Sequence, residues 1–139
     1  MTASLAVPET TVDLMLDIAR RAARNATCPR AQVGAVIARG DDVLSIGWND
    51  TPGHLPECEH PITQPCGQTV HAERMAVDLA AKAGRAIDRA VLYTTLSPCV
   101  DCAGSAITAG LRGVVYLEPY RDTLGIDLLL AAGVPTVQA

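Results

Sequence analysis

The sequence contains no phenylalanine, and aromatic residues make up only 3% of its 139 residues. Hydrophobic residues nevertheless make up 49%, so a core has to be built from alanine, valine, leucine and isoleucine. No apolar run approaches the roughly 20 residues that a membrane-spanning helix needs, and residues 1–8 lack the basic and apolar regions of a signal peptide. The length fits one domain. We expect a single domain over residues 1–139, in which residues 1–9 form a flexible tail.

Positive charge is also scarce, because 11 Lys and Arg stand against 15 Asp and Glu and leave a net charge of −4. Nucleic-acid-binding proteins concentrate Lys and Arg, so this balance argues against a nucleic-acid partner and favours a small molecule. A single arginine or a helix N-terminus can still hold one phosphate group. Five cysteines without a recognisable signal peptide favour a cytoplasmic protein that uses its thiols for metal rather than for disulfides.

Two short motifs stand out: residues 71–73 (His-Ala-Glu) and residues 98–102 (Pro-Cys-Val-Asp-Cys). Cys99 and Cys102 are three residues apart, so on a helix they share one face. Pro98 stands where a first helical turn favours proline. Thiols at a helix N-terminus ionise more readily than elsewhere. Together with His71, the two cysteines form a ligand set for Zn²⁺ that leaves the fourth position open for water.

Glu73 lies two residues after His71, where it is free to move protons instead of binding metal. This pair of motifs matches the signature of zinc-dependent nucleobase deaminases. The alternative is that His71 is a surface residue and that the cysteines are buried thiols or a redox pair. The proline before the cysteines, the offset of Glu73 and the strand-like run before the second motif favour a catalytic zinc site.

The apolar pattern predicts helices that alternate with short strands. The first helix is capped by Thr10 or Thr11 and ends within residues 25–29, and the others cover residues 70–83, 97–109 and 122–132. Strands are expected over residues 33–38, 43–48, 90–95, 114–117 and 134–137, with a hairpin turn at residues 40–42. Helices alternating with strands of the buried type predict an α/β protein, a three-layer α/β/α sandwich.

The chain resembles the cytidine and deoxycytidylate deaminase superfamily over residues 10–137, and most of all its deoxycytidylate branch. Beyond the two zinc motifs, the resemblance covers residues 33–37, 47–49 (Gly-Trp-Asn), 92–99 and 114–116, with Tyr120. It implies a five-stranded mixed sheet between helices and the hydrolytic deamination of deoxycytidylate (dCMP) to dUMP. In that reaction Glu73 takes a proton from a zinc-activated water and passes protons to N3 of the base and to the leaving amine.

The resemblance also implies substrate contacts. Asn49 matches an asparagine that contacts the nucleotide, and the backbone around Ala72 and Ser97 matches positions that read the edge of the base. Tyr120 matches a tyrosine near the phosphate end. One departure bears on this end of the substrate: Asp50 replaces the usual glycine after the asparagine, which adds negative charge near where a nucleotide phosphate would lie.

Other substrates and another class of protein stay open as alternatives. Trp48 replaces the family's usual tyrosine, and Gly-Trp-Asn also occurs in tRNA adenosine deaminases, although the net charge and the additional cysteines argue against that activity. A free base or nucleoside, such as guanine, cytosine or an antibiotic nucleoside, is a second alternative. Three arginines are candidate phosphate partners that would favour a nucleotide: Arg30, Arg112 and Arg121. A zinc-stabilised binding module without catalysis would need no acid–base residue, so the presence of Glu73 argues against it.

Three cysteines remain outside the catalytic motif, and a histidine lies between two of them. Cys28, Cys58, Cys66 and His60 form a complete set for a structural zinc, and deoxycytidylate deaminases often carry such a site. The metal would hold the long loop over residues 50–69 against the end of the first helix. The alternative is that these cysteines are ordinary buried thiols and that His60 is solvated.

Alanine-rich helical segments over residues 77–83 and 103–109 allow close packing against a second copy of the chain. The family resemblance also implies oligomers. We therefore expect a homo-oligomer with closed symmetry.

Overall fold

The computed structural model describes residues 5–53, 55–56 and 69–139. None of the helices in these ranges has the length and apolar character needed to cross a membrane. The elements follow one another as α1 (Glu9–Ala23), β1 (Gly34–Arg39), β2 (Asp42–Trp48), α2 (Ala72–Lys82), β3 (Val91–Leu96), α3 (Val100–Thr108), β4 (Gly113–Glu118), α4 (Leu124–Ala131) and β5 (Thr136–Gln138).

The strands form one five-stranded sheet in the order β2-β1-β3-β4-β5. β1 runs antiparallel to both β2 and β3, whereas β3, β4 and β5 are parallel to one another. The β1–β2 hairpin turns at Gly40, whose φ of +61° is the left-handed conformation that glycine adopts without strain. The mixed five-stranded sheet expected from the family resemblance is confirmed.

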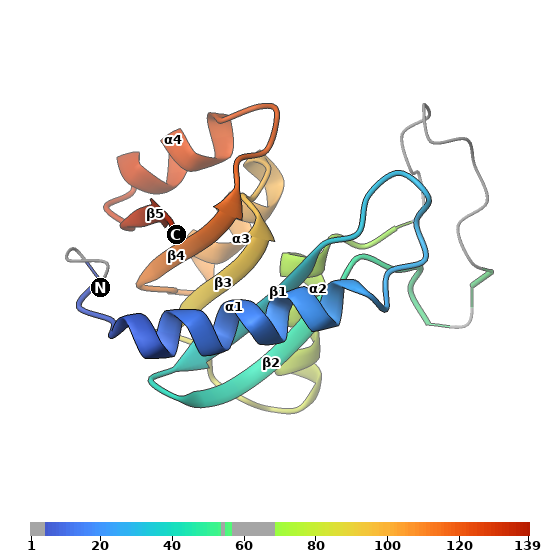
Figure 1. The fold of residues 1–139 in the computed structure, drawn as a ribbon, viewed down its shortest axis with the longest axis horizontal. Coiled ribbons are helices and arrows are strands. Elements are labelled where there is room, and N and C mark those ends of the chain that lie inside the picture. Colours follow the sequence, from blue (N-terminus) through green and yellow to red (C-terminus); the bar gives the residue numbers. More distant parts are fainter. Residues whose placement is uncertain (1–4, 54, 57–68) are drawn as a thin grey trace.

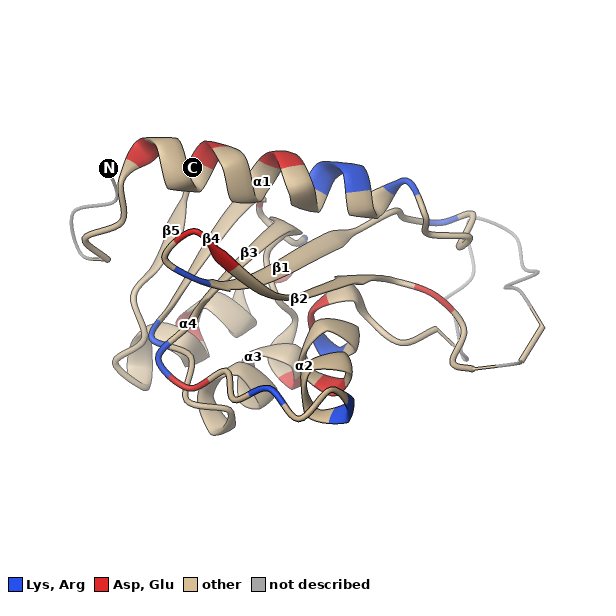
Figure 2. Ribbon diagram, turned by 90° about the horizontal axis from the view of Figure 1, so that it is seen from below, with Lys and Arg blue, Asp and Glu red and all other residues tan. Residues whose placement is uncertain are grey.

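Helices cover both faces of this sheet. α1 lies on one face, and α2, α3 and α4 lie on the other (Figures 1 and 2). Each face has its own core: Met15, Leu16 and Ala19 of α1 pack against Val36 and other strand residues. In the opposite core, five alanines of α2 and α3 pack with larger apolar side chains from the strands, the connecting segments and α4. The predicted three-layer α/β/α sandwich is therefore confirmed.

Small residues bring α2 directly onto the sheet. A Cβ atom on Gly47 would meet the carbonyl oxygen of Ala72 and lie 2.6 Å from the backbone nitrogen of Ala76. The hydroxyl of Ser45 donates a hydrogen bond to the carbonyl oxygen of Ala76 over 2.6 Å. This close contact fixes the start of α2, which carries the first of the two motifs, against β2.

The expected tail over residues 1–9 is wrong for the part that the structure describes. Leu5 and Val7 are buried in the core between α1 and the sheet. Arg112 donates a hydrogen bond to the carbonyl oxygen of Leu5 over 2.7 Å, and Gly113 leaves room for the Leu5 side chain because a Cβ there would clash with it. Burial of these two apolar side chains is enough to hold this segment against the core.

Helix starts also differ from the predicted ones. α1 begins at Glu9 directly after Pro8, and the hydroxyl of Thr11 donates to Asp41 Oδ1 over 2.7 Å instead of capping the helix. α3 begins at Val100 rather than at residue 97, because Cys99 before it has an extended backbone with ψ of 174°. The later start of α3 makes Cys99 its N-cap residue and leaves Cys102 in its first turn.

Candidate active site

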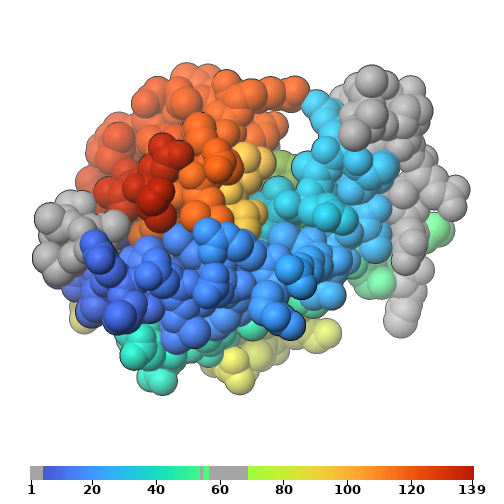
Figure 3. All heavy atoms as spheres, viewed as in Figure 1, coloured from blue at the N-terminus to red at the C-terminus, as the bar shows by residue number. Residues whose placement is uncertain are grey.

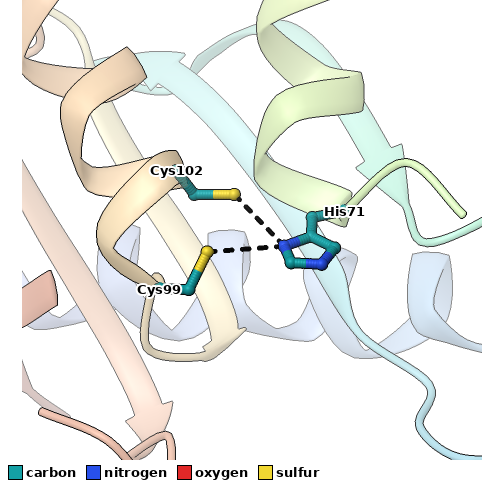
Figure 4. A group of neighbouring side chains, drawn as sticks. All are labelled: His71, Cys99 and Cys102. Carbon is teal, nitrogen blue, oxygen red and sulfur yellow. Dashed lines mark hydrogen bonds between the residues drawn. The ribbon is translucent and has the colours of Figure 1, made fainter. Parts of the chain in front are cut away.

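Two helix N-termini meet at the first candidate metal site. His71 is the N-cap residue of α2, Cys99 is the N-cap residue of α3, and Cys102 lies in the first turn of α3. His71 Nδ1 lies 3.5 Å from Cys99 Sγ and 3.4 Å from Cys102 Sγ (Figure 4). The three ligand atoms all lie within 4.8 Å of one another. The sequence placed these residues at helix starts, and the structure brings them together.

This donor set fits zinc. Two sulfur atoms and one imidazole nitrogen are the ligands that Zn²⁺ takes in catalytic sites with three protein ligands. Burial, followed by the nearby Glu73 and Cys99, raises the pKa of the Cys102 thiol well above its ordinary value. A bound dication reverses this preference, because a thiol that ligates a metal does so as thiolate. Metal binding at this site must therefore release protons.

Glu73 lies beside the cluster in the first turn of α2. Burial raises its pKa to about 7, although interactions with its own backbone and with the Cys102 side chain act in the opposite direction. A carboxyl group with a pKa near neutrality can both accept and donate a proton at physiological pH. The residue predicted to transfer protons therefore has the environment that this role requires.

His71 and Cys99 of the cluster, together with Glu73, line a cavity of about 370 Å³. Figure 3 shows the molecule open between the orange segment that follows β4 and the light-blue segment that precedes β1. These two segments contribute the outer part of the cavity wall. The cavity is lined by Cys28, Arg30, Ala31, Val33, Asn49, Thr69, His71, Ala72, Glu73, Leu96, Ser97, Cys99, Tyr120 and Arg121.

All four residues expected to contact the substrate lie on this wall: Asn49, Ala72, Ser97 and Tyr120. The side chain of Asn49 also supports the wall itself, since it accepts from Val33 N over 2.7 Å and donates to the Ala31 carbonyl over 2.8 Å. Ser97 Oγ accepts a hydrogen bond from Tyr120 N over 2.7 Å. The side chains of Asn49 and Ser97 therefore hold neighbouring wall segments in place, a role that the sequence did not reveal.

Two of the three candidate phosphate partners also lie on the cavity wall. Arg30 and Arg121 line it, whereas Arg112 is bonded to the segment before α1 and is not among the lining residues. Asp50 is not among them either. Its carboxylate accepts hydrogen bonds from Thr27, Trp48 and Thr51, so the expected negative charge is not on the wall of the cavity.

The second cysteine cluster falls largely outside the described residues. Cys58, His60 and Cys66 lie in the part of the chain that the structure does not describe. Cys28 is described, and its buried side chain lines the same cavity as the first candidate metal site. The sequence did not predict this position. Within the described ranges, His71, Cys99 and Cys102 are the group of three or more potential metal ligands that the structure brings together.

The mixed sheet, the His/Cys/Cys cluster at two helix N-termini and the neighbouring carboxyl group define a zinc-dependent deaminase class. Residues 9–118 match the family model described as the cytidine and deoxycytidylate deaminase zinc-binding region. The chain belongs to this family.

Several named proteins are similar to this chain. ComE operon protein 2 of Bacillus subtilis is 36% identical over 84% of this chain and 64% of its own length. Deoxycytidylate deaminase of Schizosaccharomyces pombe is 33% identical over 86% of this chain and 41% of its own. The chain thus spans less than two thirds of these two relatives. A crystal structure of dCMP deaminase from the cyanophage S-TIM5, in complex with dCMP and dUMP, superposes with a TM-score of 0.89 at 33% identity, covering 95% of this chain and 98% of that one.

Proposed function

We propose that this chain catalyses the zinc-dependent hydrolytic deamination of dCMP to dUMP with release of ammonia. One observation carries the proposal: Glu73, with its pKa near 7, lies beside the His71, Cys99 and Cys102 cluster, and it lines the same cavity as His71 and Cys99. Similarity to the cyanophage dCMP deaminase that binds dCMP and dUMP supports the choice of substrate.

His71, Cys99 and Cys102 would hold the metal, and zinc bound there supplies the Lewis acidity that makes water nucleophilic near neutral pH. The oxygen of the attacking water bonds to C4, and Glu73 transfers the two protons of that water in turn, the first to N3 of the base and the second to the amino group on C4. The C4–N bond then breaks, ammonia leaves, and the base becomes uracil. The burial of Glu73 keeps bulk water away from the carboxyl group and strengthens its hydrogen bonds.

The two ends of the cavity suit the two ends of a nucleotide. The backbone around Ala72 and Ser97 lies at the metal end and would read the edge of the base, while Asn49 contacts the nucleotide. Arg30 and Arg121 provide positive charge on the same wall for the phosphate, beside Tyr120. The Arg121 guanidinium lies 5.7 Å from the centroid of the Tyr120 ring, close enough for the ring to hold it by a cation–π interaction.

Positive charge outside the cavity supports an anionic substrate. Arg20 and Arg21 lie in the last turn of α1, and Figure 2 shows the basic residues of this helix at the end that leads into the segment before β1. Its acidic residues lie toward the other end. This separation would steer an anion toward the cavity although the whole chain carries a net charge of −4.

We also propose a second, structural zinc held by Cys28, Cys58, His60 and Cys66, a homo-oligomeric assembly and a cytoplasmic location. The buried thiol of Cys28 at the end of the α1 segment supports the first of these. A shallow hollow between α2 and α3, lined by small side chains such as Ser105 and Ala109 and by the Arg74–Asp78 ion pair, supports packing of another copy there.

A substrate panel tests the proposed reaction. Zinc-loaded protein is incubated with dCMP, CMP, deoxycytidine, cytosine, guanine and an adenosine-containing tRNA, and ammonia release is measured. We expect dCMP to have a higher kcat/KM than deoxycytidine, cytosine and guanine, because these three compounds offer no phosphate to Arg30 and Arg121. Equal turnover of deoxycytidine would refute nucleotide specificity. Deamination of none of these compounds would favour the binding-module alternative.

A further inference from the structure

The side-chain carboxylate of Asp50, just after the end of β2, accepts three hydrogen bonds. Its Oδ1 accepts from the hydroxyl of Thr27 over 2.9 Å and from Thr51 N over 2.8 Å. Its Oδ2 accepts from the indole Nε1 of Trp48 over 3.2 Å. Hydrogen bonds to a charged acceptor are stronger than neutral ones. The carboxylate is therefore held in one orientation and links the segment before β1 to the end of β2.

The backbone of Asp50 makes a second link. Asp50 and Val70 form an isolated antiparallel bridge, in which Asp50 N donates to Val70 O over 3.2 Å and Val70 N donates to Asp50 O over 2.8 Å. Val70 directly precedes His71, the metal-ligand candidate at the start of α2. One residue thus touches both the segment that leads to the metal cluster and the segment that leads to the outer cavity wall.

The Thr27 hydrogen bond bears directly on the cavity. Thr27 is followed by Cys28 and, three positions along, by Arg30, and both of these residues line the cavity. The segment between α1 and β1 has no helix or strand of its own. Among the residues that the structure describes, its backbone hydrogen bonds lie only near its two ends, so the position of its middle part depends on side-chain hydrogen bonds such as this one. Gln32 adds a further bond within the same segment, to the Ala26 carbonyl over 3.1 Å.

We propose that Asp50 is a positioning residue that sets substrate affinity by holding the wall segment of Thr27–Arg30 in place beside the His71 segment. The inference rests on the proposed function, since the affinity concerned is that for a nucleotide. Asp50 itself is absent from the cavity wall and acts through Thr27. Loss of this link lets the wall, and Arg30 with it, move away from the substrate phosphate.

A matched pair of variants tests the proposal. Thr27→Val removes the hydroxyl that donates to Asp50. Thr11→Val removes an equivalent threonine-to-aspartate bond, from Thr11 to Asp41 over 2.7 Å, which joins the other end of α1 to the β1–β2 turn. We expect Thr27→Val to raise KM for dCMP about tenfold with kcat within about twofold, and Thr11→Val to leave KM unchanged, because each loses one charge-assisted hydrogen bond but only the first is next to the cavity.

Hydrogen exchange provides a readout that does not need turnover. We expect the amides of residues 26–34 to exchange about tenfold faster in Thr27→Val than in the unchanged protein, while Thr11→Val leaves them protected. Asp50→Asn should act in the same direction, because its amide nitrogen would face Thr51 N–H or Trp48 Nε1–H, both of which are donors.

The outcomes separate this proposal from the proposed function. Unchanged exchange and unchanged KM in Thr27→Val would overturn the positioning role of Asp50. An equal rise in KM in both threonine variants would also overturn it, because the effect would then follow general stability. If the unchanged protein deaminates no nucleotide, the proposed function fails. The exchange comparison then still decides whether Asp50 holds this wall.

Discussion

Besides burial, the carboxyl group of Glu73 helps to raise the pKa of the Cys102 thiol, although the two residues come from different helices. The proposed proton carrier and one candidate metal ligand are therefore close enough to interact electrostatically before any substrate binds. This interaction couples the N-terminus of α2 to that of α3, and both helices stand on the same face of the sheet (Figure 2). A substitution of either residue should therefore alter the environment of the other.

Glu73→Gln should abolish turnover and leave zinc in place. The amide has a similar shape but cannot accept and return a proton, and loss of a general acid–base residue lowers rates by about 10²–10⁴-fold. Ammonia release and zinc content measured on the same preparation check this expectation. Full activity in this variant would remove Glu73 from the mechanism, whereas loss of zinc would make it a structural residue of the metal site.

The same substitution should stabilise the protein after zinc has been stripped. Burial raises the pKa of Glu73 from 4.5 to about 7, so the folded state binds more protons than the unfolded state between these values. The stability of the unchanged protein therefore falls as pH rises through this window, by about 3 kcal/mol at most. Urea unfolding should show Glu73→Gln to be the more stable protein at pH 8 and a smaller difference near pH 4. An equal difference at both pH values would contradict this explanation.

Cys99→Ser should lose the catalytic zinc and the activity together. A serine hydroxyl does not ionise near neutral pH as a cysteine thiol does, so the site would keep only two of its three ligands. Val100→Ala is the matched control, because it changes the adjacent and exposed residue on the same helix without touching the cluster. Zinc content by atomic absorption and ammonia release check both variants. A fully active Cys99→Ser protein would overturn the assignment.

The sequence predicted those parts of the site that depend on local pattern. His71 and Cys99 were expected at helix starts, and both prove to be N-cap residues. By contrast, nothing local distinguishes Arg30 from Arg112. Their different positions, on the cavity wall and against Leu5, follow from contacts between segments far apart in the chain. Leu5 was placed in a tail for the same reason, since one buried leucine has no periodicity.

Close approaches of backbone were also missed. Gly47 and Gly125 each lie against backbone of another segment, but a glycine in the sequence does not reveal what it faces. For Gly47, the only indication in the sequence was its place beside Trp48 and Asn49, in a segment that resembles the family. Gly125 has no such neighbour, and only the packing of α4 against α3 shows its role.

Zinc content is expected to be two per chain in freshly purified protein. If Cys28, Cys58, His60 and Cys66 hold a second zinc, Cys58→Ala should lower the content to one and reduce thermal stability, because metal binding at such a site contributes folding free energy. Activity should fall only indirectly. One zinc per chain, with Cys28, Cys58 and Cys66 freely titratable by a thiol reagent, would rule the site out and weaken the dCMP assignment.

Gly125→Ala should weaken zinc binding without touching a ligand. A Cβ atom at Gly125 would meet the carbonyl oxygen of Pro98 and lie 2.9 Å from the carbonyl carbon of Cys99, so either α4 or the Cys99 segment has to move. Displacement of this ligand should lower zinc affinity by about tenfold, a cost of about 1.4 kcal/mol, and competition with a chromogenic chelator measures it.

Gly104→Ala is the matched control for this substitution. It lies within α3, and a Cβ there would meet nothing within 4 Å, so alanine should stabilise the helix by about 0.5–1 kcal/mol and leave zinc affinity unchanged. The difference in zinc affinity between the two variants shows whether the contact at Gly125 positions the metal ligand. Unchanged zinc affinity in Gly125→Ala would mean that α4 yields instead of the Cys99 segment, and that the contact of α4 with Pro98 does not position the metal ligand.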